Sequence, residues 1–304
     1  MIRFNNKKRC GQSVLKEQWP MLLMMLPFFA IFTLLTVVPI ISSFVLSFTS
    51  FDMLNPIKCV GIDNYLRMFV SDDDFLIVLK NTLVLVLLTG PVGFMLAFLL
   101  AWLVNEFTPK VRTILSFMFY APSLAGNAYL VWKLFFSGDS YGYLNSFLLD
   151  LGMITEPITW LNDTRYLLAI IVLVQLWQST GISFLSNIAG LQNVSRDLYE
   201  AGSIDGIKNR WQELWYITMP SMQHMILFSV VMQIQSSFTI STITTEMAGY
   251  PSVGYTVDTI VSHMHDVGNV RFKMGYASAI AVVLFLIMAG TRIILGKFLD
   301  IIGK

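Results

Sequence analysis

The sequence predicts an all-α membrane protein with six transmembrane helices, and three observations support this fold class. The 304 residues are 55% apolar and only 13% charged, with a mean hydropathy of +0.66, so the chain is far more hydrophobic than a soluble domain. Apolar runs of about 20 residues, long enough to cross a bilayer as a helix, occur six times. No run shows the alternation of a membrane barrel, so helices must satisfy the backbone polar groups in lipid.

The six runs define the expected domain organisation. A short N-terminal segment, 1–19, precedes a transmembrane domain at 20–304. The spans are predicted near 20–48, 76–104, 111–137, 166–190, 221–246 and 274–297. The first run follows a Lys-Lys-Arg cluster, as a secretory signal would, but it is too long for a signal peptide and lacks a clear small-residue cleavage site. We therefore expect it to be a membrane anchor.

The distribution of charge predicts the orientation. If the N-terminus is cytoplasmic, 13 of the 20 Lys and Arg residues fall on the inner side, and 12 of the 19 acidic residues fall outside. Because positive charge stays on the cytoplasmic side, both termini are predicted to be cytoplasmic. The segment between the fourth and fifth spans then faces the cytoplasm. Cys10 and Cys59 would lie on opposite sides of the membrane, so they could not form a disulfide with each other.

The ionisable residues near the spans lie at their ends. Lys80, Lys133, His224 and Arg292 are all within reach of an interface, where long side chains can extend toward water. Ion-driven carriers and proton pumps usually place ionisable groups deep within their spans. We therefore expect either that the energy for transport enters at another part of the protein or that transport uses no energy source.

The span interiors contain uncharged hydrogen-bonding side chains instead. Amides and hydroxyls can hold neighbouring helices together in lipid, or they can line a path for a polyhydroxylated solute, and both interpretations stay open. The substrate-path candidates are Asn127, Gln175, Gln178, Ser179, Gln233, Ser236 and Ser237.

A compact charged segment, 195–220, separates the fourth and fifth spans. Ser195 is placed to cap a short helix, which should break at Gly206 before a second short helix starts near Asn209 and leads to Pro220. This segment is either a surface helix packed under its own bundle or a rigid helix-turn-helix presented to a soluble partner. Ala201 and Gly202 would allow close approach of such a partner.

Residues of this segment resemble the EAA loop of permease subunits in bacterial ABC importers. The resemblance is carried by Glu200-Ala201-Gly202, by Asp205-Gly206 and by the closing Ile217-Thr218-Met219-Pro220. It implies that this coupling loop docks on a separate nucleotide-binding subunit, with Glu200, Ala201, Gly202, Asp205, Gly206 and Pro220 as the coupling residues. This chain departs from the family pattern at three positions. It has Gly202, Ile207 and Met219 where the family has Ala, Ala and Leu.

The last predicted span is similar to that of the carbohydrate-import branch, and in particular to the larger permease subunit of the maltose transporter. This likeness covers MGYASAIAVVLFLIM, from Met274 to Met288, where small residues four apart allow close helix packing. That branch often has a run of glycines ending in Pro after the fifth span, whereas this chain has Met247-Ala248-Gly249-Tyr250-Pro251.

The resemblance implies a sugar-import permease of the bacterial cell membrane that is not itself an enzyme. It implies a second permease subunit, two copies of a cytoplasmic ATPase that binds ATP and Mg, and an extracytoplasmic solute-binding protein. The chain contains no GxxxxGK[ST] motif, so the ATPase must be a separate polypeptide.

Two rival classes, a secondary carrier or channel and a membrane-bound enzyme, leave the charged segment unexplained. No GxSxG, HExxH or paired-Cys motif occurs, and no metal site or cofactor is expected. His263 and His265 are predicted to lie in a solvated loop, because two histidines alone rarely hold a metal.

Overall fold

The computed structural model describes residue 19 and residues 23–302, and these residues form helices and loops without any strand. The all-α prediction is therefore confirmed for this part of the chain. In chain order the elements are η1 (Thr33–Val37), α2 (Val38–Leu46), α3 (Asp63–Val70), α4 (Asp73–Asn105), α5 (Pro109–Leu124), α6 (Tyr129–Phe135), α7 (Tyr143–Asp150), α8 (Thr164–Asn193), α9 (Arg196–Ile204), α10 (Arg210–Glu213), η2 (Leu214–Thr218), α11 (Met219–Ser221), α12 (Gln223–Phe238), α13 (Thr242–Ala248), η3 (Val253–Tyr255), α14 (Ile260–His265), η4 (Asp266–Val270) and α15 (Met274–Ile302).

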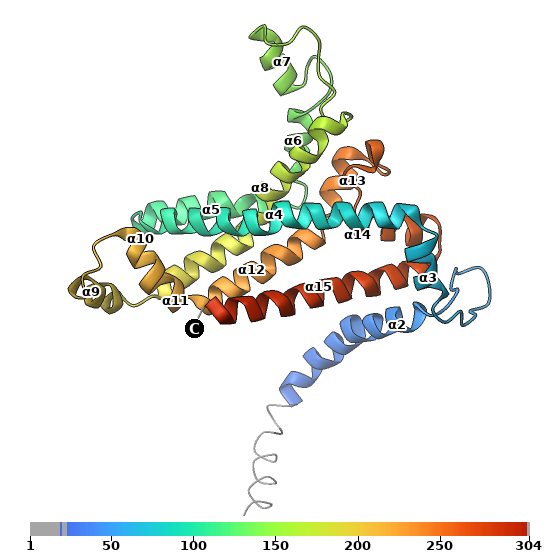
Figure 1. The fold of residues 1–304 in the computed structure, drawn as a ribbon, viewed down its shortest axis with the longest axis horizontal. Coiled ribbons are helices and arrows are strands. Elements are labelled where there is room, and N and C mark those ends of the chain that lie inside the picture. The colour runs from blue at the N-terminus through green and yellow to red at the C-terminus, as the bar shows by residue number, and fades with distance from the viewer. Residues whose placement is uncertain (1–18, 20–22, 303–304) are drawn as a thin grey trace, which may run out of the picture.

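The centre of the molecule is a bundle of α4, α8 and α12, which pack on one another more extensively than any other helices (Figure 1). Helix α5 lies against α8, and α15 packs along α2, α12 and α14. Buried apolar side chains form three clusters: one around α3, α14 and the start of α15, one where α6 and α13 meet the start of α8, and one where the end of α4 packs against α8 and the start of α12. The short helices α9 and α10 lie at one end of the bundle, and α3 and α14 lie at the other (Figure 1).

Five helical segments in the described part of the chain are long and apolar enough to cross a membrane. They are Leu23–Leu46, Asp73–Asn105, Thr164–Asn193, Gln223–Ala248 and Met274–Lys297. A sixth candidate is a pair, Pro109–Leu124 with Tyr129–Phe135, bent by 83°. The predicted run 111–137 is therefore broken, because Pro122 lies inside α5 and Ala125 adopts an extended backbone that ends the helix.

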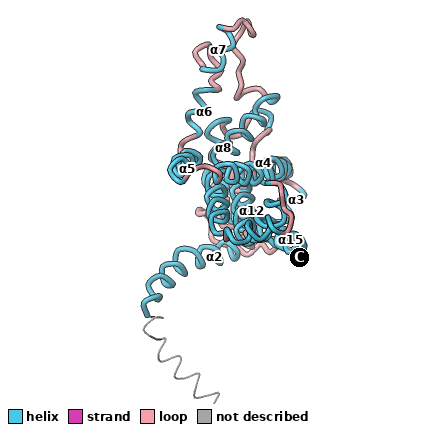
Figure 2. The backbone as a smooth tube through the Cα atoms, turned by 90° about the vertical axis from the view of Figure 1, so that its left-hand side faces the viewer, coloured by secondary structure: helices cyan, strands magenta, loops and turns pink. Residues whose placement is uncertain are grey.

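The first apolar helix stands apart from the bundle. None of the residues in its most apolar window, within Leu23–Leu46, is buried in the chain. Figure 2 shows this helix leaving the body of the molecule at an angle, with only its later part next to α15. A helix that is apolar on all sides and unburied in its own chain must be covered by lipid or by another subunit.

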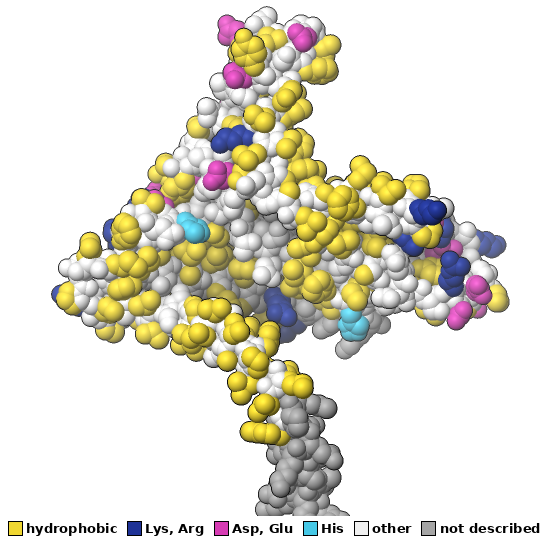
Figure 3. Space-filling model, turned by 180° about the vertical axis from the view of Figure 1, so that it is seen from behind, with side chains coloured by type: hydrophobic (Ala, Val, Ile, Leu, Met, Phe, Trp, Pro, Cys, Tyr) yellow, Lys and Arg dark blue, Asp and Glu magenta, His cyan; other side chains and the backbone are white. Residues whose placement is uncertain are grey.

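Residues 136–163, which we call the arm, extend away from the bundle between α6 and α8 and carry α7 (Figure 1). Figure 3 shows hydrophobic side chains spread over the body of the molecule, whereas acidic groups recur on the arm and both signs of charge gather near α9 and α10. This distribution suits a protein whose middle lies in lipid and whose ends reach water.

The structure corrects the prediction for His263, which is not part of a solvated loop. Its side chain is 1% exposed, with Nε2 3.4 Å from Asp72 Oδ2 and Nδ1 3.1 Å from the Tyr250 hydroxyl. Asp72 also caps α4 by accepting the Phe75 N–H. His263 therefore links α14 to the start of α4, whereas His265 is exposed.

Candidate functional site: the coupling segment and a polar cavity

Residues 195–220, which we call the coupling segment, fold through local signals in the sequence. Ser195 caps α9 by accepting the Asp197 N–H at 3.3 Å, and Asn209 caps α10 by accepting the Trp211 N–H. Gly206 lies between the two helices with φ +95°, a conformation that a residue with a side chain rarely adopts. The predicted pair of short helices joined at Gly206 is thus present in the structure.

Gly202 is buried against two isoleucines of the same segment. A Cβ at position 202 would lie 2.5 Å from Ile217 Cδ1 and 3.2 Å from Ile207 Cδ1. The Ile207 N–H also donates to the Gly202 carbonyl at 2.9 Å, which closes the turn after α9. Both isoleucines therefore restrict position 202, and Ile217 restricts it more tightly than Ile207 does.

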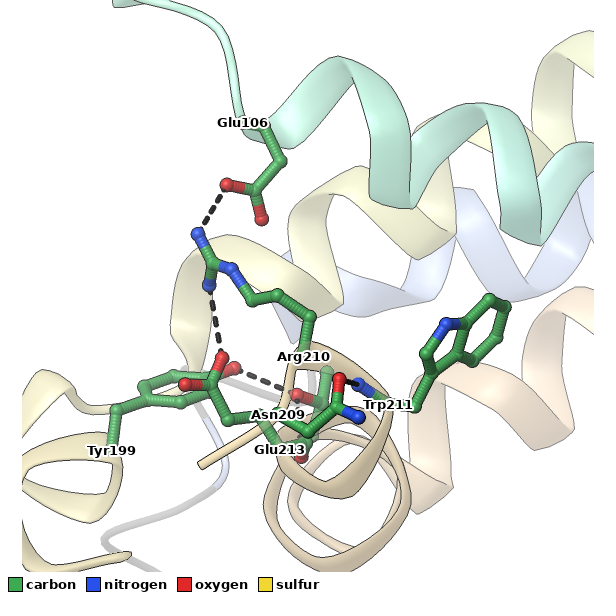
Figure 4. Close-up of polar contacts among 7 residues, drawn as sticks. Glu106, Tyr199, Asn209, Arg210, Trp211 and Glu213 are labelled. Atoms are coloured by element: carbon green, nitrogen blue, oxygen red, sulfur yellow. Dashed lines mark hydrogen bonds and ion pairs between the residues drawn. The ribbon is translucent and has the colours of Figure 1, made fainter. Parts of the chain in front are cut away.

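Charged side chains join the coupling segment to the end of α4. The Arg210 guanidinium lies between two carboxylates (Figure 4). Its Nη2 donates to Glu106 Oε2 at 2.5 Å, and its Nη1 donates to Glu213 Oε2 at 3.0 Å. The hydrogen bond from Arg210 to Glu213, together with the charge of Glu106, raises the pKa of the guanidinium above its usual value. Beside this ion pair, the Trp102 and Trp211 rings lie 5.1 Å apart. Helix α10 is thus held to α4 by both a charge pair and an aromatic contact.

A second contact holds α9 to the remainder of the segment. The Tyr199 hydroxyl lies 2.9 Å from the hydroxyl of Thr218, which is 2% exposed. Thr218 in turn donates to the Glu213 carbonyl at 3.2 Å. A polar cavity of about 500 Å³ lies between these residues and the ends of α4 and α8. The Thr218 hydroxyl therefore joins α9 to the second half of the coupling segment.

The predicted coupling residues differ in their accessibility. Glu200, Ala201, Asp205 and Gly206 are exposed, and so is Pro220 at the start of α11, whereas Gly202 is buried. The exposed residues lie where a separate protein could reach them, while Gly202 holds the two helices together from inside. Leu214 is buried against the bundle, whereas Trp215 remains 63% exposed.

A second polar cavity, of about 280 Å³, lies between α5, α8 and α12. Four of the substrate-path candidates line it, namely Gln175, Gln178, Ser179 and Ser236. Gln178 lines the cavity, and its side-chain oxygen is buried and has no hydrogen-bond partner in the described residues. No acidic or basic side chain lines this cavity.

Two other candidates are buried between helices. Gln233 is fully buried and donates to Ser179 at 2.9 Å, and its carbonyl oxygen accepts from Ser183 at 3.0 Å. Ser237 lies 2.8 Å from Thr89, which donates to it. These contacts join α4, α8 and α12, and they support the alternative that these two side chains hold the helices together.

Asn127 lies in the break between α5 and α6 and is not among the residues that line the cavity. Its side-chain oxygen instead accepts from the Tyr129 hydroxyl at 3.4 Å.

Several hydroxyl groups that line the cavity were not predicted from the sequence. The missed residues are Ser123, Ser183, Thr239, Ser241 and Thr242. The dense run of Ser and Thr after 235 is a signal that could have found three of them.

Comparison with known proteins places this arrangement in a family. Residues 90–300 match the family described as "Binding-protein-dependent transport system inner membrane component". The chain belongs to this family of ABC transporter permeases. The permease is therefore a multi-pass protein of the cell membrane and a transport subunit without enzymatic activity of its own.

Several relatives of the permease match it over most of their length. The probable ABC transporter permease protein YesP of Bacillus subtilis (strain 168) is 34% identical, over 89% of this chain and 87% of the relative. The arabinooligosaccharides transport system permease protein AraP of the same organism is 30% identical, over 86% and 82%. The lactose transport system permease protein LacF of Rhizobium radiobacter is 32% identical, over 67% and 68%.

The fold of the permease is also shared with a solved structure. A bacterial ABC transporter involved in the import of the acidic polysaccharide alginate contains a chain that superimposes with a TM-score of 0.79 at 22% identity. The match covers 96% of the permease and 99% of the other chain. The same architecture occurs in the alginate transporter in complex with an alginate pentasaccharide-bound periplasmic protein, also with a TM-score of 0.79.

Proposed function

We propose that the permease imports a neutral saccharide through the polar cavity between α5, α8 and α12. The observation that carries this proposal is the lining of that cavity, in which amides and hydroxyls meet without any charged side chain. Such groups offer both donors and acceptors to sugar hydroxyls, and the unpaired Gln178 oxygen would become one such acceptor on rotation of its side chain toward the cavity. The relatives named for arabinooligosaccharide and lactose transport support the same substrate class.

The coupling segment supports the second part of the proposal, which concerns energy. Its exposed residues Glu200, Ala201 and Asp205 would dock on a separate ATPase, and the contacts of Arg210 with Glu106 would pass the movement to α4. ATP binding to the ATPase would favour one conformation of the spans, and ATP hydrolysis would favour the other. Such a shift requires that the ATPase bind the two conformations of the permease with different affinity. The coupling segment and both termini would then lie in the cytoplasm.

The complete transporter in this proposal contains four kinds of subunit. The permease pairs with a second permease chain, and two ATPase subunits bind below while a solute-binding protein delivers the sugar from outside. The unburied first helix, Leu23–Leu46, is consistent with a partner chain beside it, because no other helix of the described residues covers it fully. ATP and Mg are bound by the ATPase and not by this chain.

A transport assay tests the substrate class and the energy source together. The assembled transporter would be placed in liposomes with ATP inside and the sugar-loaded binding protein on the opposite side, and a panel of neutral and acidic oligosaccharides would be compared. We expect uptake of neutral saccharides only when ATP is present. Saccharide uptake that proceeds equally well without ATP would identify a carrier or channel instead.

A further inference from the structure

Three arginines from three helices line the polar cavity between the coupling segment and the bundle. Arg112 comes from α5, Arg196 from α9 and Arg210 from α10. The cavity volume of about 500 Å³ falls within the range of roughly 300–1,000 Å³ that is typical of sites for small ligands. The function proposed above assigns no ligand to this cavity.

The charges that line the cavity do not cancel. Glu106 and Glu213 are the carboxylates of its wall, and both accept hydrogen bonds from Arg210. In the part of the chain that the structure describes, Arg112 and Arg196 form no ion pair. Three guanidinium groups minus two carboxylates leave a net charge of +1. The excess positive charge belongs to Arg112 and Arg196, and an anion between them would neutralise it.

The end of α4 holds Arg112 in position. Its side chain is half-buried, and its Nη1 donates to Asn105 Oδ1 at 3.0 Å. A guanidinium has five N–H donors, so most of this group remains available to a ligand. Arg196 is exposed at the start of α9. A ligand bound by both arginines would therefore connect α5 to the coupling segment.

A phosphate group fits two arginines on different helices better than a carboxylate does. A guanidinium donates a pair of parallel hydrogen bonds to either anion. The two oxygens of a carboxylate lie in one plane with its carbon, whereas phosphate oxygens point to the corners of a tetrahedron. Phosphate can therefore accept from two guanidinium groups that approach from different directions.

The cavity lies where two apolar helices end and begin. Helix α4 ends at Asn105, and α5 begins at Pro109. Trp102 lines the cavity, and tryptophan is enriched where a membrane meets water. Basic pockets between the ends of membrane helices bind the headgroups of anionic phospholipids.

An exposed apolar face of α5 begins next to Arg112. Val111, Ile114 and Met118 are three or four residues apart, so they share one face of the helix. Their exposed fractions are 41%, 62% and 61%. The acyl chains of a phospholipid would lie against this face while its phosphate lies in the cavity. A soluble phosphate compound would offer the same anion without the chains.

We propose that the cavity holds an anionic phosphate group between Arg112 and Arg196, supplied by a phospholipid headgroup or by a soluble phosphate compound. The bound phosphate connects α5 to α9, and it fastens the coupling segment to the bundle at a second place besides the contact of Arg210 with Glu106. This inference goes beyond the proposed function and does not depend on the transported solute. Its placement on the cytoplasmic side alone rests on the proposed orientation.

An equilibrium binding assay on the assembled transporter tests this inference. The transporter, purified in detergent without nucleotide or saccharide, would be immobilised and titrated separately with radiolabelled dioctanoylphosphatidylglycerol and radiolabelled inorganic phosphate. Dioctanoylphosphatidylcholine measures the nonspecific lipid binding that is subtracted. Saturable binding of phosphatidylglycerol alone identifies the lipid as the source of the phosphate, whereas saturable binding of inorganic phosphate identifies a soluble compound.

Whichever probe binds, Arg112→Gln combined with Arg196→Gln should raise its dissociation constant at least about tenfold, because two charge-assisted contacts are lost. Arg112→Lys combined with Arg196→Lys keeps the charge but loses the paired donors, so its dissociation constant should lie between those of the native and Gln-substituted transporters. Assembly of each variant would be checked by its elution in size-exclusion chromatography.

The matched control is Lys110→Gln combined with Lys208→Gln. It removes two exposed positive charges near the same end of the chain's bundle, and neither residue lines the cavity. This control should change the dissociation constant less than about twofold, because exposed charges act weakly at a distance. Phosphate bound by the ATPase subunits would persist in every variant.

Three results would overturn the site. They are the absence of saturable binding of both phosphate probes to the native transporter, an unchanged dissociation constant in the Arg112→Gln, Arg196→Gln transporter, and equal losses in this variant and in the lysine control. The assay includes no transport step, so its failure leaves the proposed saccharide import intact. Failure of ATP-dependent uptake would, in turn, leave the phosphate site intact.

Discussion

At the scale of single residues, Gly202 shows how one side chain restricts another in the coupling segment. A methyl group at this position would overlap Ile217 Cδ1, so we expect Gly202→Ala to lower stability by about 1–3 kcal/mol. Ile217→Val removes that same Cδ1 atom, and the double variant should recover part of the loss. Thermal unfolding of the purified permease measures this difference. Strictly additive effects of the two substitutions would show that Gly202 and Ile217 do not compete for space.

The polar cavity provides a second prediction at the residue scale. Gln178→Ala removes an unpaired acceptor from the cavity wall, so the saccharide concentration that half-saturates uptake should rise roughly three- to tenfold. The matched control is Gln235→Ala on α12, because Gln235 lines a separate apolar groove between α12 and α15. Equal effects of the two substitutions on uptake would remove the cavity from the transport path.

Part of the candidate site could be predicted from single residues. Ser195, Gly206 and Asn209 act locally, since a cap or a left-handed turn depends on neighbouring backbone, and all three have the expected roles. The burial of Gly202 depends on Ile217, which the chain brings back only after a second helix. Contacts of this kind depend on tertiary packing, so the sequence pattern alone did not indicate them.

At the scale of elements, the link between α10 and α4 is the part of the coupling segment most open to test. The Arg210 side chain is largely exposed and contributes little to stability, because exposed ion pairs are typically worth less than about 1 kcal/mol. Arg210→Gln should therefore leave the unfolding temperature nearly unchanged but increase the ATP hydrolysed per saccharide imported. Lys208→Gln, a charge removal two residues away, serves as the control. If the Arg210→Gln transporter hydrolyses the same amount of ATP per saccharide imported as the native one, the contact between Arg210 and Glu106 does not take part in energy transfer.

Two properties of the helices could not be predicted from the sequence: the sharp break between α5 and α6, and the rotation of each helix about its own axis. Apolar runs located the helices well, since run length and composition decide membrane insertion. The same runs could not show that α5 and α6 meet at 83°, because a Pro within a membrane helix often causes only a slight kink. They also could not show which face of α8 or α12 lines the cavity. Gln178 and Gln233 were therefore equivalent in sequence, yet one lines the cavity and the other is buried between helices.

At the scale of the whole molecule, the proposed orientation predicts a labelling pattern. Cys59 is exposed in the loop after the first span, and Ser203 is exposed on α9. In a Cys10→Ser background, a membrane-impermeant maleimide should label Cys59 in intact cells stripped of their wall. Ser203→Cys, in a chain that also carries Cys59→Ser, should react only after the membrane is opened. Labelling of position 203 in intact cells would reverse the orientation.

The central claim is that ATP hydrolysis by a separate subunit drives saccharide import through the coupling segment. Its most direct test compares ATP-dependent uptake by the native transporter with uptake by a Gly206→Leu variant, since leucine does not fit the φ of +95° at this turn. The variant should still assemble in the membrane, and its ATPase should still hydrolyse ATP, but saccharide uptake should fall close to background. Normal ATP-dependent uptake by the Gly206→Leu transporter would contradict the account.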